Sequence, residues 1–264
     1  MINVLNTLLF RIKKSKLLFV LLAFVVVLSA VESALYLGLL NYSGEEAEMV
    51  GQLVGGDIFS LSMSSLVRVE SYAPMFTAIF VALFLGTDFS EGTIRNAVLS
   101  NKKRWQIYLA YVIVALGVGV LFVLAQAVAS IVGIAATDGF ADYSATEVLT
   151  GTFASVGLGI LSSWVMAMGA LCMLVATKKK ALSLILPLAS VIALSTVLEI
   201  VVLWASLQGS YIGYMEWIPF VQLMFYSPVS VDGALIGKIL LINGLLAVGE
   251  GVLGNFVFAK AQLK

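Results

Sequence analysis

Hydrophobic side chains in this chain gather into six long runs separated by shorter polar segments. The runs span residues 17–41, 71–87, 105–136, 150–177, 181–207 and 234–259. A helix needs about 20 apolar residues to cross the hydrocarbon core of a bilayer, and lipid leaves backbone polar groups unsatisfied unless they pair within a helix or a closed barrel. Because the runs are continuously apolar, without the alternation of barrel strands, they predict an all-α integral membrane protein. We expect six transmembrane helices in one transmembrane domain, residues 1–264.

The second run is the shortest of the six and could recruit residues from about 65. Ahead of the first run, Ile2, Leu5, Leu9 and Ile12 recur at helical spacing. They predict an N-terminal amphipathic helix that lies in the membrane interface. The basic residues after it resemble the start of a signal peptide, but the apolar run is too long for one. We therefore expect a retained span, with the amphipathic helix acting either as an anchor or as part of a docking surface for a cytoplasmic partner.

Charged residues are scarce and unevenly distributed. They make up 11% of the 264 residues, while hydrophobic residues make up 61%; soluble domains carry about one quarter charged residues. If the N-terminus is inside, all but two of the 15 Lys and Arg side chains fall in cytoplasmic segments, the exceptions being Arg68 and Lys238. This asymmetry satisfies the positive-inside rule and predicts that both termini are cytoplasmic. The net charge is zero, so no nucleic-acid-binding face is expected.

Several kinds of chemistry are excluded by composition. The chain contains no histidine and one cysteine, Cys172, so His-ligated metals, Ser-His-Asp and Cys-His triads and disulfides are absent. No P-loop is present, because Gly237-Lys238 is followed by Ile. Residues 249–254 match G-x-G-x-x-G but lie within an apolar run and follow no strand, so we do not expect a dinucleotide site.

The loop between the second and third runs, residues 86–104, predicts a short cytoplasmic coupling helix. Ser90 or Thr93 could cap this helix, and basic residues close its C-terminal end, where cations are favoured. Ile94 and Val98 line one apolar face together with Ala97. A plain loop needs no apolar face, so exposed apolar side chains here predict a socket in another protein.

This loop resembles the segment after the second span in permease subunits of ABC-2 type exporters. In those proteins an acidic residue, Gly-Thr, a basic or polar pair and a downstream Arg precede the third span. The matching residues are Glu91, Gly92-Thr93, Arg95-Asn96 and Arg104. Length, span number and short loops are similar to those of lantibiotic-immunity and bacitracin-resistance permeases. Two positions depart from the pattern: Tyr111 stands where a Lys is expected, and the usual Pro is absent from the loop.

The resemblance implies the permease subunit of an ATP-binding cassette exporter in a cell membrane, the inner or cytoplasmic membrane of a bacterium. Two permeases, identical or homologous, would form the pathway, and separate ATPase subunits would bind ATP and Mg²⁺. The substrate would be amphipathic: an antimicrobial peptide, another peptide or a lipid-like compound. No cofactor is expected on this chain. The implied ATPase-coupling residues are Phe89, Glu91, Gly92, Thr93, Ile94, Arg95, Asn96, Val98 and Arg104.

Two other classes of protein stay open. A secondary transporter or channel driven by an ion gradient would use acids inside the spans, although the sequence shows no obvious pair of broken helices. A membrane enzyme is hard to assemble without histidine or a polar cluster in any span.

Three acidic residues fall inside the predicted spans. At 1.5 Å per residue, Glu250 lies roughly 14 Å from the inner end of its span, near the bilayer midplane, while Glu32 and Glu199 come out in the outer leaflet. A charge at the midplane costs about 2.5–3.5 kcal/mol on insertion scales, so Glu250 should face protein, water or a basic partner. We expect Glu250 either to form hydrogen bonds between helices or to line the pathway or the dimer interface. Glu199 is expected to pair with Lys238 at similar depth.

Overall fold

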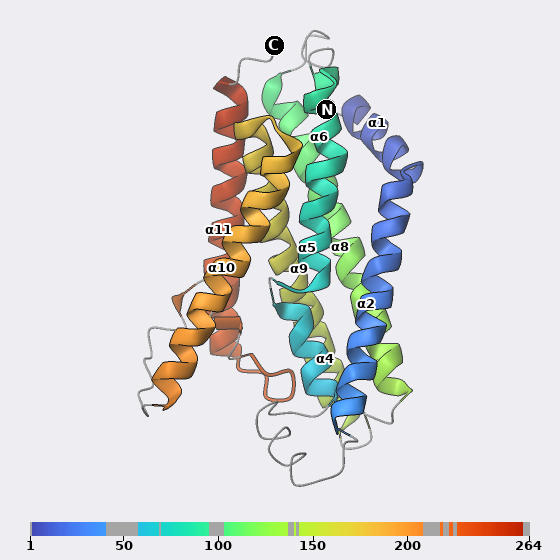
Figure 1. The fold of residues 1–264 in the computed structure, drawn as a ribbon, viewed down its shortest axis with the longest axis vertical. Helices are drawn as coiled ribbons and strands as arrows, with labels where there is room; N and C mark the ends of the chain where they lie inside the picture. The colour runs from blue at the N-terminus through green and yellow to red at the C-terminus, as the bar shows by residue number, and fades with distance from the viewer. Residues whose placement is uncertain are drawn as a thin grey trace.

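A computed structural model describes residues 2–40, 58–68, 70–94, 103–136, 140, 143–207, 217–218, 222–223 and 226–260 (Figure 1). The regular structure within these ranges is helical. The helices are α1 (Ile2–Lys13), α2 (Lys16–Leu40), α4 (Ile58–Val67), α5 (Tyr72–Phe80), the π-helical turn η1 (Val81–Leu85), α6 (Gly86–Ser90), α8 (Arg104–Ala135), α9 (Ala145–Thr177), α10 (Lys180–Leu207) and α11 (Gly233–Lys260).

Six stretches of helix in the described chain are long and apolar enough to cross a membrane. They are Lys16–Tyr36, Phe59–Ser90, Arg104–Ala135, Ala145–Thr177, Lys180–Leu198 and Gly233–Lys260. The predicted all-α fold with six spanning helices is confirmed to this extent. Six such helices agree with the multi-pass membrane protein that the apolar runs predict.

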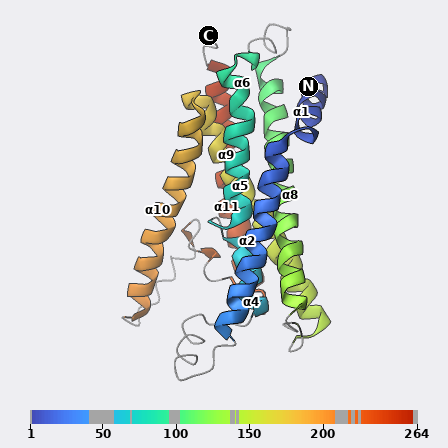
Figure 2. The ribbon, with the colours of Figure 1, turned by 45° about the vertical axis from the view of Figure 1, so that its right-hand side comes forward.

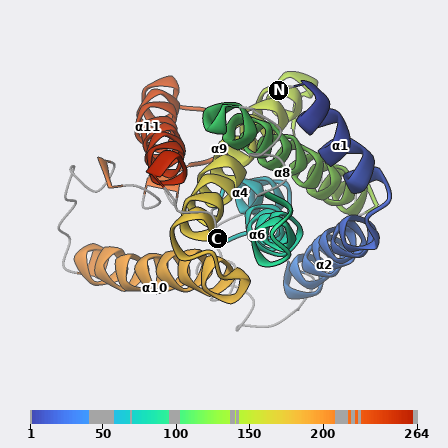
Figure 3. The ribbon, with the colours of Figure 1, turned by 90° about the horizontal axis from the view of Figure 1, so that it is seen from above.

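Helix α9 occupies the middle of the bundle. It packs against α4, α5, α8, α10 and α11, and Figure 3 shows these helices arranged around it. Helix α10 buries little of its surface in the bundle, because it diverges from the other helices along its length (Figure 2). Most large side chains of α10 are consequently exposed, including Ile185, Val197 and Ile200.

One end of the bundle gathers basic residues and both described chain ends. Helix α1, the start of α8, the α9–α10 turn and the last turn of α11 meet there (Figure 1). We call it the basic end, after Lys13, Arg104, Lys178 and Lys260. The clustering agrees with the charge asymmetry in the sequence, because those residues come from separate inter-span segments.

The second span begins earlier than predicted and is broken. We expected it over residues 71–87 with a possible extension back to about 65, but α4 already forms a helix at Ile58–Val67 and α5 begins only at Tyr72, so the described residues 68, 70 and 71 lie outside both helices. The segment Ile58–Val67 holds four serines, which lowers its apparent hydropathy. Two of them hide their hydroxyls by donating to their own helix, Ser64 Oγ to Leu61 O at 3.0 Å and Ser65 Oγ to Ser62 O at 2.9 Å. Such local bonds let serine enter an apolar helix.

Polar side chains from neighbouring helices satisfy the backbone at this break. On the α4 side, Ser162 Oγ of α9 donates to Val67 O at 2.6 Å. On the α5 side, Ala73 N–H donates to Gln126 Oε1 of α8 at 2.9 Å. Both side chains are fully buried. Irregular backbone at membrane depth is tolerated only where protein or enclosed water satisfies it, and here α8 and α9 do so.

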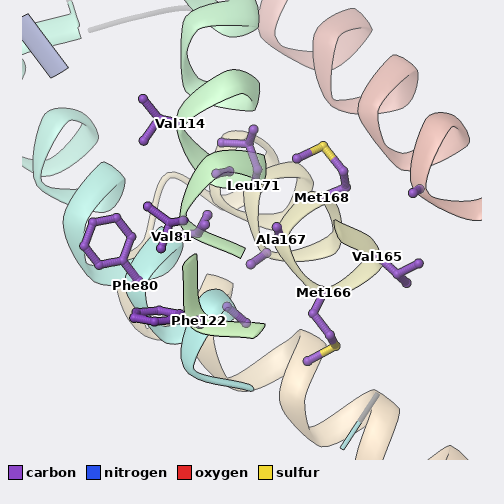
Figure 4. Close-up of a cluster of buried hydrophobic side chains, with 14 of the residues drawn as sticks. Phe80, Val81, Val114, Phe122, Val165, Met166, Ala167, Met168 and Leu171 are labelled. Carbon is purple, nitrogen blue, oxygen red and sulfur yellow. The ribbon is translucent and has the colours of Figure 1, made fainter. Parts of the chain in front are cut away.

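The core between α5, η1, α8 and α9 is apolar and closely packed (Figure 4). Phe80 stacks on Phe84 at 4.8 Å between ring centroids and meets Phe122 edge-on at 6.4 Å. Two glycines allow helices to approach closely: a methyl group at Gly159 would lie 2.6 Å from Leu66 O, and one at Gly119 would lie 3.2 Å from Ser163 Cβ. A methyl group added at Gly117, Gly157, Gly233 or Gly237 would meet nothing within 4 Å.

Helix α1 packs on α8 rather than only on a membrane surface. Leu8 and Ile12 are buried against the bundle, while Leu9 and Phe10 are exposed. The helix thus has two apolar faces, one toward the protein and one outward. The predicted stripe through Leu9 and Ile12 is split between these faces, since a helix lying against a bundle buries only the side chains on that side.

Candidate functional site at the basic end

Asp88 is the centre of the most extensive polar cluster in the described chain. Its carboxylate accepts from Arg11 Nη1 at 2.6 Å, Thr93 Oγ1 at 2.9 Å and Tyr111 OH at 3.1 Å. The Asp88 residue is only 3% exposed. Four segments therefore meet at one carboxylate: α1, the end of the second span, the loop that follows it and the third span. We call Arg11, Thr87, Asp88, Thr93 and Tyr111 the Asp88 cluster.

Arg11 is held by more than its ion pair with Asp88. Its Nη2 donates to Thr87 Oγ1 at 3.2 Å, and its guanidinium lies 5.2 Å from the centroid of the Phe84 ring. A planar guanidinium suits such combined pairing and stacking, which Lys could not reproduce. The arrangement fastens the C-terminal part of α1 to the end of the second span.

Gly92 turns the chain back toward Asp88. Helix α6 closes with Glu91 N–H donating to Thr87 O at 2.8 Å, and Gly92 then adopts φ +70°. Left-handed backbone favours glycine, because other residues carry a Cβ that is strained there. The reversal brings Thr93 Oγ1 to the carboxylate. Gly92 therefore provides the turn, and Thr93 provides a hydrogen-bond donor to the Asp88 carboxylate.

Ile94 is not the exposed docking residue that the pattern suggested. It is 3% exposed and packs into the main core of this chain. The prediction of a free apolar face is therefore wrong at this position: the Gly92 turn folds the segment onto the bundle instead of projecting it. Phe89, half-buried, packs nearby against Tyr111 and Phe258, with ring centroids 6.3 and 6.4 Å apart.

The remaining predicted coupling residues divide into three groups. Glu91 is exposed beside the cluster. Arg104 Nη1 donates to Ala259 O at 2.9 Å, joining the start of α8 to the end of α11, where a cation also meets the negative end of the helix dipole. Arg95, Asn96 and Val98 lie outside the described residues. Ser90, one of the two possible helix caps, donates its hydroxyl to Thr87 O at 3.1 Å.

The intramembrane acid Glu250 faces protein, as expected. It lies on α11 against Gly169 of α9, where an added methyl group would come 3.4 Å from Glu250 Oε1. Its Oε2 is buried without a hydrogen-bond partner among the described residues, as are both polar side-chain atoms of Asn243 two turns away. We call this contact between α9 and α11 the α9–α11 seam.

The other two predicted acids lie toward the opposite end. Glu32 Oε1 accepts from Tyr36 OH at 2.8 Å within α2. The side chain of Glu199 lies outside the described part, so its expected pairing with Lys238 stays a prediction. Lys238 Nζ lies 5.5 Å from the centroid of the Trp217 ring, a cation–π geometry that accounts for its position near the end of the bundle.

Sequence reasoning missed Arg11, Thr87 and Asp88 as site residues. Arg11 was counted only among basic residues, and Asp88 was passed over for Glu91. A usable signal was present: Asp88 is an acidic residue within an apolar helix end, and Arg11 is the basic residue that interrupts the α1 face between Leu8 and Ile12. A buried carboxylate is costly unless a cation or hydrogen-bond donors stabilise it, so an Arg and an Asp near the same end of the bundle are candidates to pair.

Among the described residues, no group of three or more His, Cys, Asp and Glu side chains could hold a metal ion. No protein-family model matches the chain, and a search of the curated proteins found no match. The described geometry is that of a helical bundle with six helices long and apolar enough to span a membrane, and its Asp88 cluster joins the N-terminal helix α1 to two of them.

Proposed function

We propose that this chain is the permease subunit of an ATP-binding cassette exporter, with ATP hydrolysis carried out by a separate partner ATPase. The Asp88 cluster is the observation that supports this proposal. In such an exporter the ATPase displaces surface helices of the permease, and this displacement must be transmitted to the membrane spans. Arg11, Asp88 and Tyr111 connect α1 to the second and third spans at one end of the bundle.

Burial makes the connection between Arg11 and Asp88 strong. Asp88 is almost entirely enclosed, and removing one partner of a buried ion pair costs about 3–5 kcal/mol. Arg11 is 37% exposed in its side chain, so the lower end of that range applies here. With a connection of this strength, a displacement of α1 moves the second and third spans with it as a rigid body, and α1 does not move independently of them.

The proposed assembly contains a second permease, identical or homologous, related by approximate two-fold symmetry. Helix α10 supports this part of the proposal. Its side chains Val197, Ile200 and Trp204 are 57–61% exposed, and the helix leans out of the bundle (Figure 2). A neighbouring subunit would cover surface that this chain leaves bare.

The expected setting is the inner or cytoplasmic membrane of a bacterium, with the basic end inside. ATP and Mg²⁺ would be bound by the ATPase, and this chain would carry no catalytic residues or cofactor. The substrate class we propose is amphipathic, with an antimicrobial peptide first and other peptides or lipid-like compounds next. Antibiotic resistance or lantibiotic immunity would follow from export of such a compound.

The test is purification of the tagged chain in mild detergent from its native membrane. Mass spectrometry should recover a P-loop ATPase of separate sequence in stoichiometric amount. The variant Arg11→Gln should lower that recovery about tenfold, because the loss of a charged hydrogen bond of 1.5–3 kcal/mol frees α1. Lys13→Gln, an exposed position on the same helix, is the matched control and should retain the ATPase.

Repeated recovery of folded wild-type chain without any ATPase would refute the proposal. Equal retention by Arg11→Gln and Lys13→Gln would instead refute the role given to the Asp88 cluster. Gel filtration of each variant distinguishes both results from misfolding.

A second candidate function is a transporter or channel driven by an ion gradient. The interrupted second span favours it, because discontinuous helices beside intramembrane acids often bind ions or substrates, and Arg68, Glu70 and Ser71, between α4 and α5, lie near Glu32. Purified chain reconstituted without ATPase separates the two functions. Uptake that follows an imposed proton or sodium gradient would favour this candidate over the exporter.

A further inference from the structure

A pocket of about 380 Å³ lies between α8 and α11, with α9 as its back wall. Its lining is almost entirely apolar. It comes from the α8 face between Trp105 and Leu116, from the α11 face between Ala247 and Asn255, and from Trp164 and Met168 of α9. We call it the α8–α11 pocket. Ligand pockets in proteins begin near about 300 Å³, so its volume is sufficient for a ligand.

Gly251 leaves the pocket open on the α11 side. A methyl group added there would lie 3.7 Å from Met168 Sδ, an ordinary contact, so a larger side chain at this position would occupy the pocket. At the back, Trp164 Nε1 already donates to Leu116 O at 3.3 Å, and the indole ring therefore needs no other polar partner. A buried water requires two to four polar partners, so hydrocarbon suits the middle of this pocket better than water does.

The pocket extends through one leaflet, from the middle of the bilayer toward the basic end. Ala247 lies at the middle of α11, and Asn255 follows it by eight residues, or about 12 Å along the helix. Half of the hydrocarbon core is about 15 Å thick, so the pocket has the length of a leaflet's acyl chains. Lys260, thirteen residues beyond Ala247, lies about 20 Å from the middle, among the lipid head groups.

The rim of the pocket faces lipid. Val248 and Val252 of α11 are 63% and 64% exposed, and Trp105 at the start of α8 is 49% exposed. Large apolar side chains at this depth contact acyl chains, and Trp105 lies at the end of the pocket where Trp marks the membrane interface. A lipid chain can therefore enter the pocket sideways from the bilayer.

Two exposed lysines lie at the head-group end of the pocket. Arg104 Nη1 donates to Ala259 O at 2.9 Å and joins the start of α8 to the end of α11. Lys103 directly precedes the first of these residues, Lys260 directly follows the second, and both are exposed. Lys260 Nζ lies 4.1 Å from the centroid of the Phe256 ring, itself 58% exposed. Neither lysine pairs with a carboxylate of the described residues, and basic side chains here attract anionic head groups.

We propose that the α8–α11 pocket holds one acyl chain of an anionic phospholipid, whose phosphate lies against Lys103 and Lys260. The chain fills the pocket from Asn255 to the middle of α11 and supplies dispersion contacts that a void would lack. The apolar walls select a hydrocarbon chain, and the lysines select a negative head group. Phosphatidylglycerol satisfies both requirements, whereas zwitterionic phosphatidylcholine satisfies only the first.

The experiment measures lipid binding to the purified chain by native mass spectrometry in detergent. Phosphatidylglycerol and phosphatidylcholine of the same short chain length are titrated separately. We expect phosphatidylglycerol to bind about tenfold more tightly, the effect of one charged hydrogen bond. Equal affinity of the wild-type protein for the two lipids would overturn the proposal of an anionic head group.

Filling the pocket tests where the acyl chain binds. Gly251→Leu should weaken both lipids by about tenfold, because its side chain takes the place of about two methylene groups of the lipid. The matched control is Gly249→Leu, at an exposed position of α11 where an added methyl group meets nothing within 4 Å, and it should bind like the wild type. Equal binding by the two variants would overturn the pocket as the site. Val112→Phe fills the pocket from α8 and gives an independent test if Gly251→Leu does not fold.

Removing the two lysines tests the head-group contact. The double variant Lys103→Gln, Lys260→Gln should lose the preference for phosphatidylglycerol and keep the affinity for phosphatidylcholine, whereas Lys13→Gln, an exposed lysine of α1 at the same end, should keep both. An unchanged preference in the double variant would overturn the assignment of the phosphate. A dimer that persists at saturating phosphatidylglycerol and is lost in Gly251→Leu would overturn the lipid in favour of a second copy of the chain. These measurements use the chain without any ATPase, so their outcome is independent of the proposed exporter function.

Discussion

The Asp88 cluster and the α9–α11 seam each enclose an acidic side chain between helices, yet they treat it in opposite ways. The Asp88 carboxylate accepts from three other side chains. Glu250 leaves Oε2 buried without a partner among the described residues. A buried polar group is stabilising only when it is bonded. The first region therefore fixes helices relative to one another, whereas the second carries a desolvation penalty that polar bonds do not offset.

The difference originates in which side chains surround each acid. Around Asp88 the chain supplies Arg11, Thr93 and Tyr111, all donors. Around Glu250 it supplies Gly169, whose missing side chain gives the carboxylate room but no hydrogen bond. Tyr108 and Cys172 are close enough to interact with the carboxylate electrostatically, but the buried Tyr108 hydroxyl makes no hydrogen bond among the described residues. Small residues let helices approach closely in a membrane. The seam is accordingly held by close packing, and we expect it to tolerate changes in polarity that the Asp88 cluster does not.

The largest effect should come from Asp88→Ala, which would leave Arg11 and Tyr111 without their shared acceptor. We expect a loss of about 3 kcal/mol, at the low end of the range for a broken buried pair because Arg11 is partly exposed. Thermal unfolding in detergent should show it as a drop of about 6–12 °C in Tm. Glu91→Ala, exposed three residues further on, is the control and should shift the stability by less than about 0.5 kcal/mol.

An Asp88→Ala protein as stable as Glu91→Ala would show that the cluster does not hold α1, and the contrast with the seam would disappear. Protease access to the α1–α2 junction gives a second readout. Cleavage there should accelerate in Asp88→Ala while the rest of the bundle stays protected, since the loss is local to one end.

A smaller loss of stability is expected from adding a methyl group to α9 where it packs against the backbone of α4. This change tests close packing without altering any polar bond. Gly159→Ala would place a methyl group 2.6 Å from Leu66 O, a backbone atom of the broken span, and overpacking of this kind costs about 1–3 kcal/mol. Gly157→Ala meets nothing within 4 Å and should be neutral or stabilising by up to about 1 kcal/mol, as Ala favours helix over Gly. Equal unfolding temperatures for the two variants would contradict the close contact between α4 and α9.

The spans could be predicted from the sequence because the membrane imposes a simple rule on apolar length. All six runs reappear as helices; the second differs most in extent, and the fourth helix begins at Ala145, five residues ahead of its predicted run. The part before about residue 65 was missed because its serines count as polar in a hydropathy profile, although hydroxyls such as that of Ser64 bond to their own helix. Length and polarity alone do not show where a hydroxyl is directed.

The candidate site was less predictable because its residues are far apart in sequence. Gly92 and Thr93 were found through a local motif, and the structure gives both a local role. Arg11 meets Asp88 across 77 positions, and no spacing rule connects them. Ile94 was misplaced because its polar neighbours made an exposed helix face the simplest interpretation, whereas the left-handed Gly92 redirects the chain onto the core.

The smallest effect should come from Glu250→Gln, which keeps the side-chain shape and removes the charge. Because Oε2 has no described partner, the substitution breaks no hydrogen bond there and relieves desolvation, so stability should change by less than about 1 kcal/mol. Thermal unfolding beside Asp88→Ala measures the contrast directly. A loss as large as that of Asp88→Ala would mean that Glu250 is bonded in the membrane by water or a neighbouring subunit. In that case, repeating the measurement across protein concentrations would identify the subunit, since its contribution weakens on dilution.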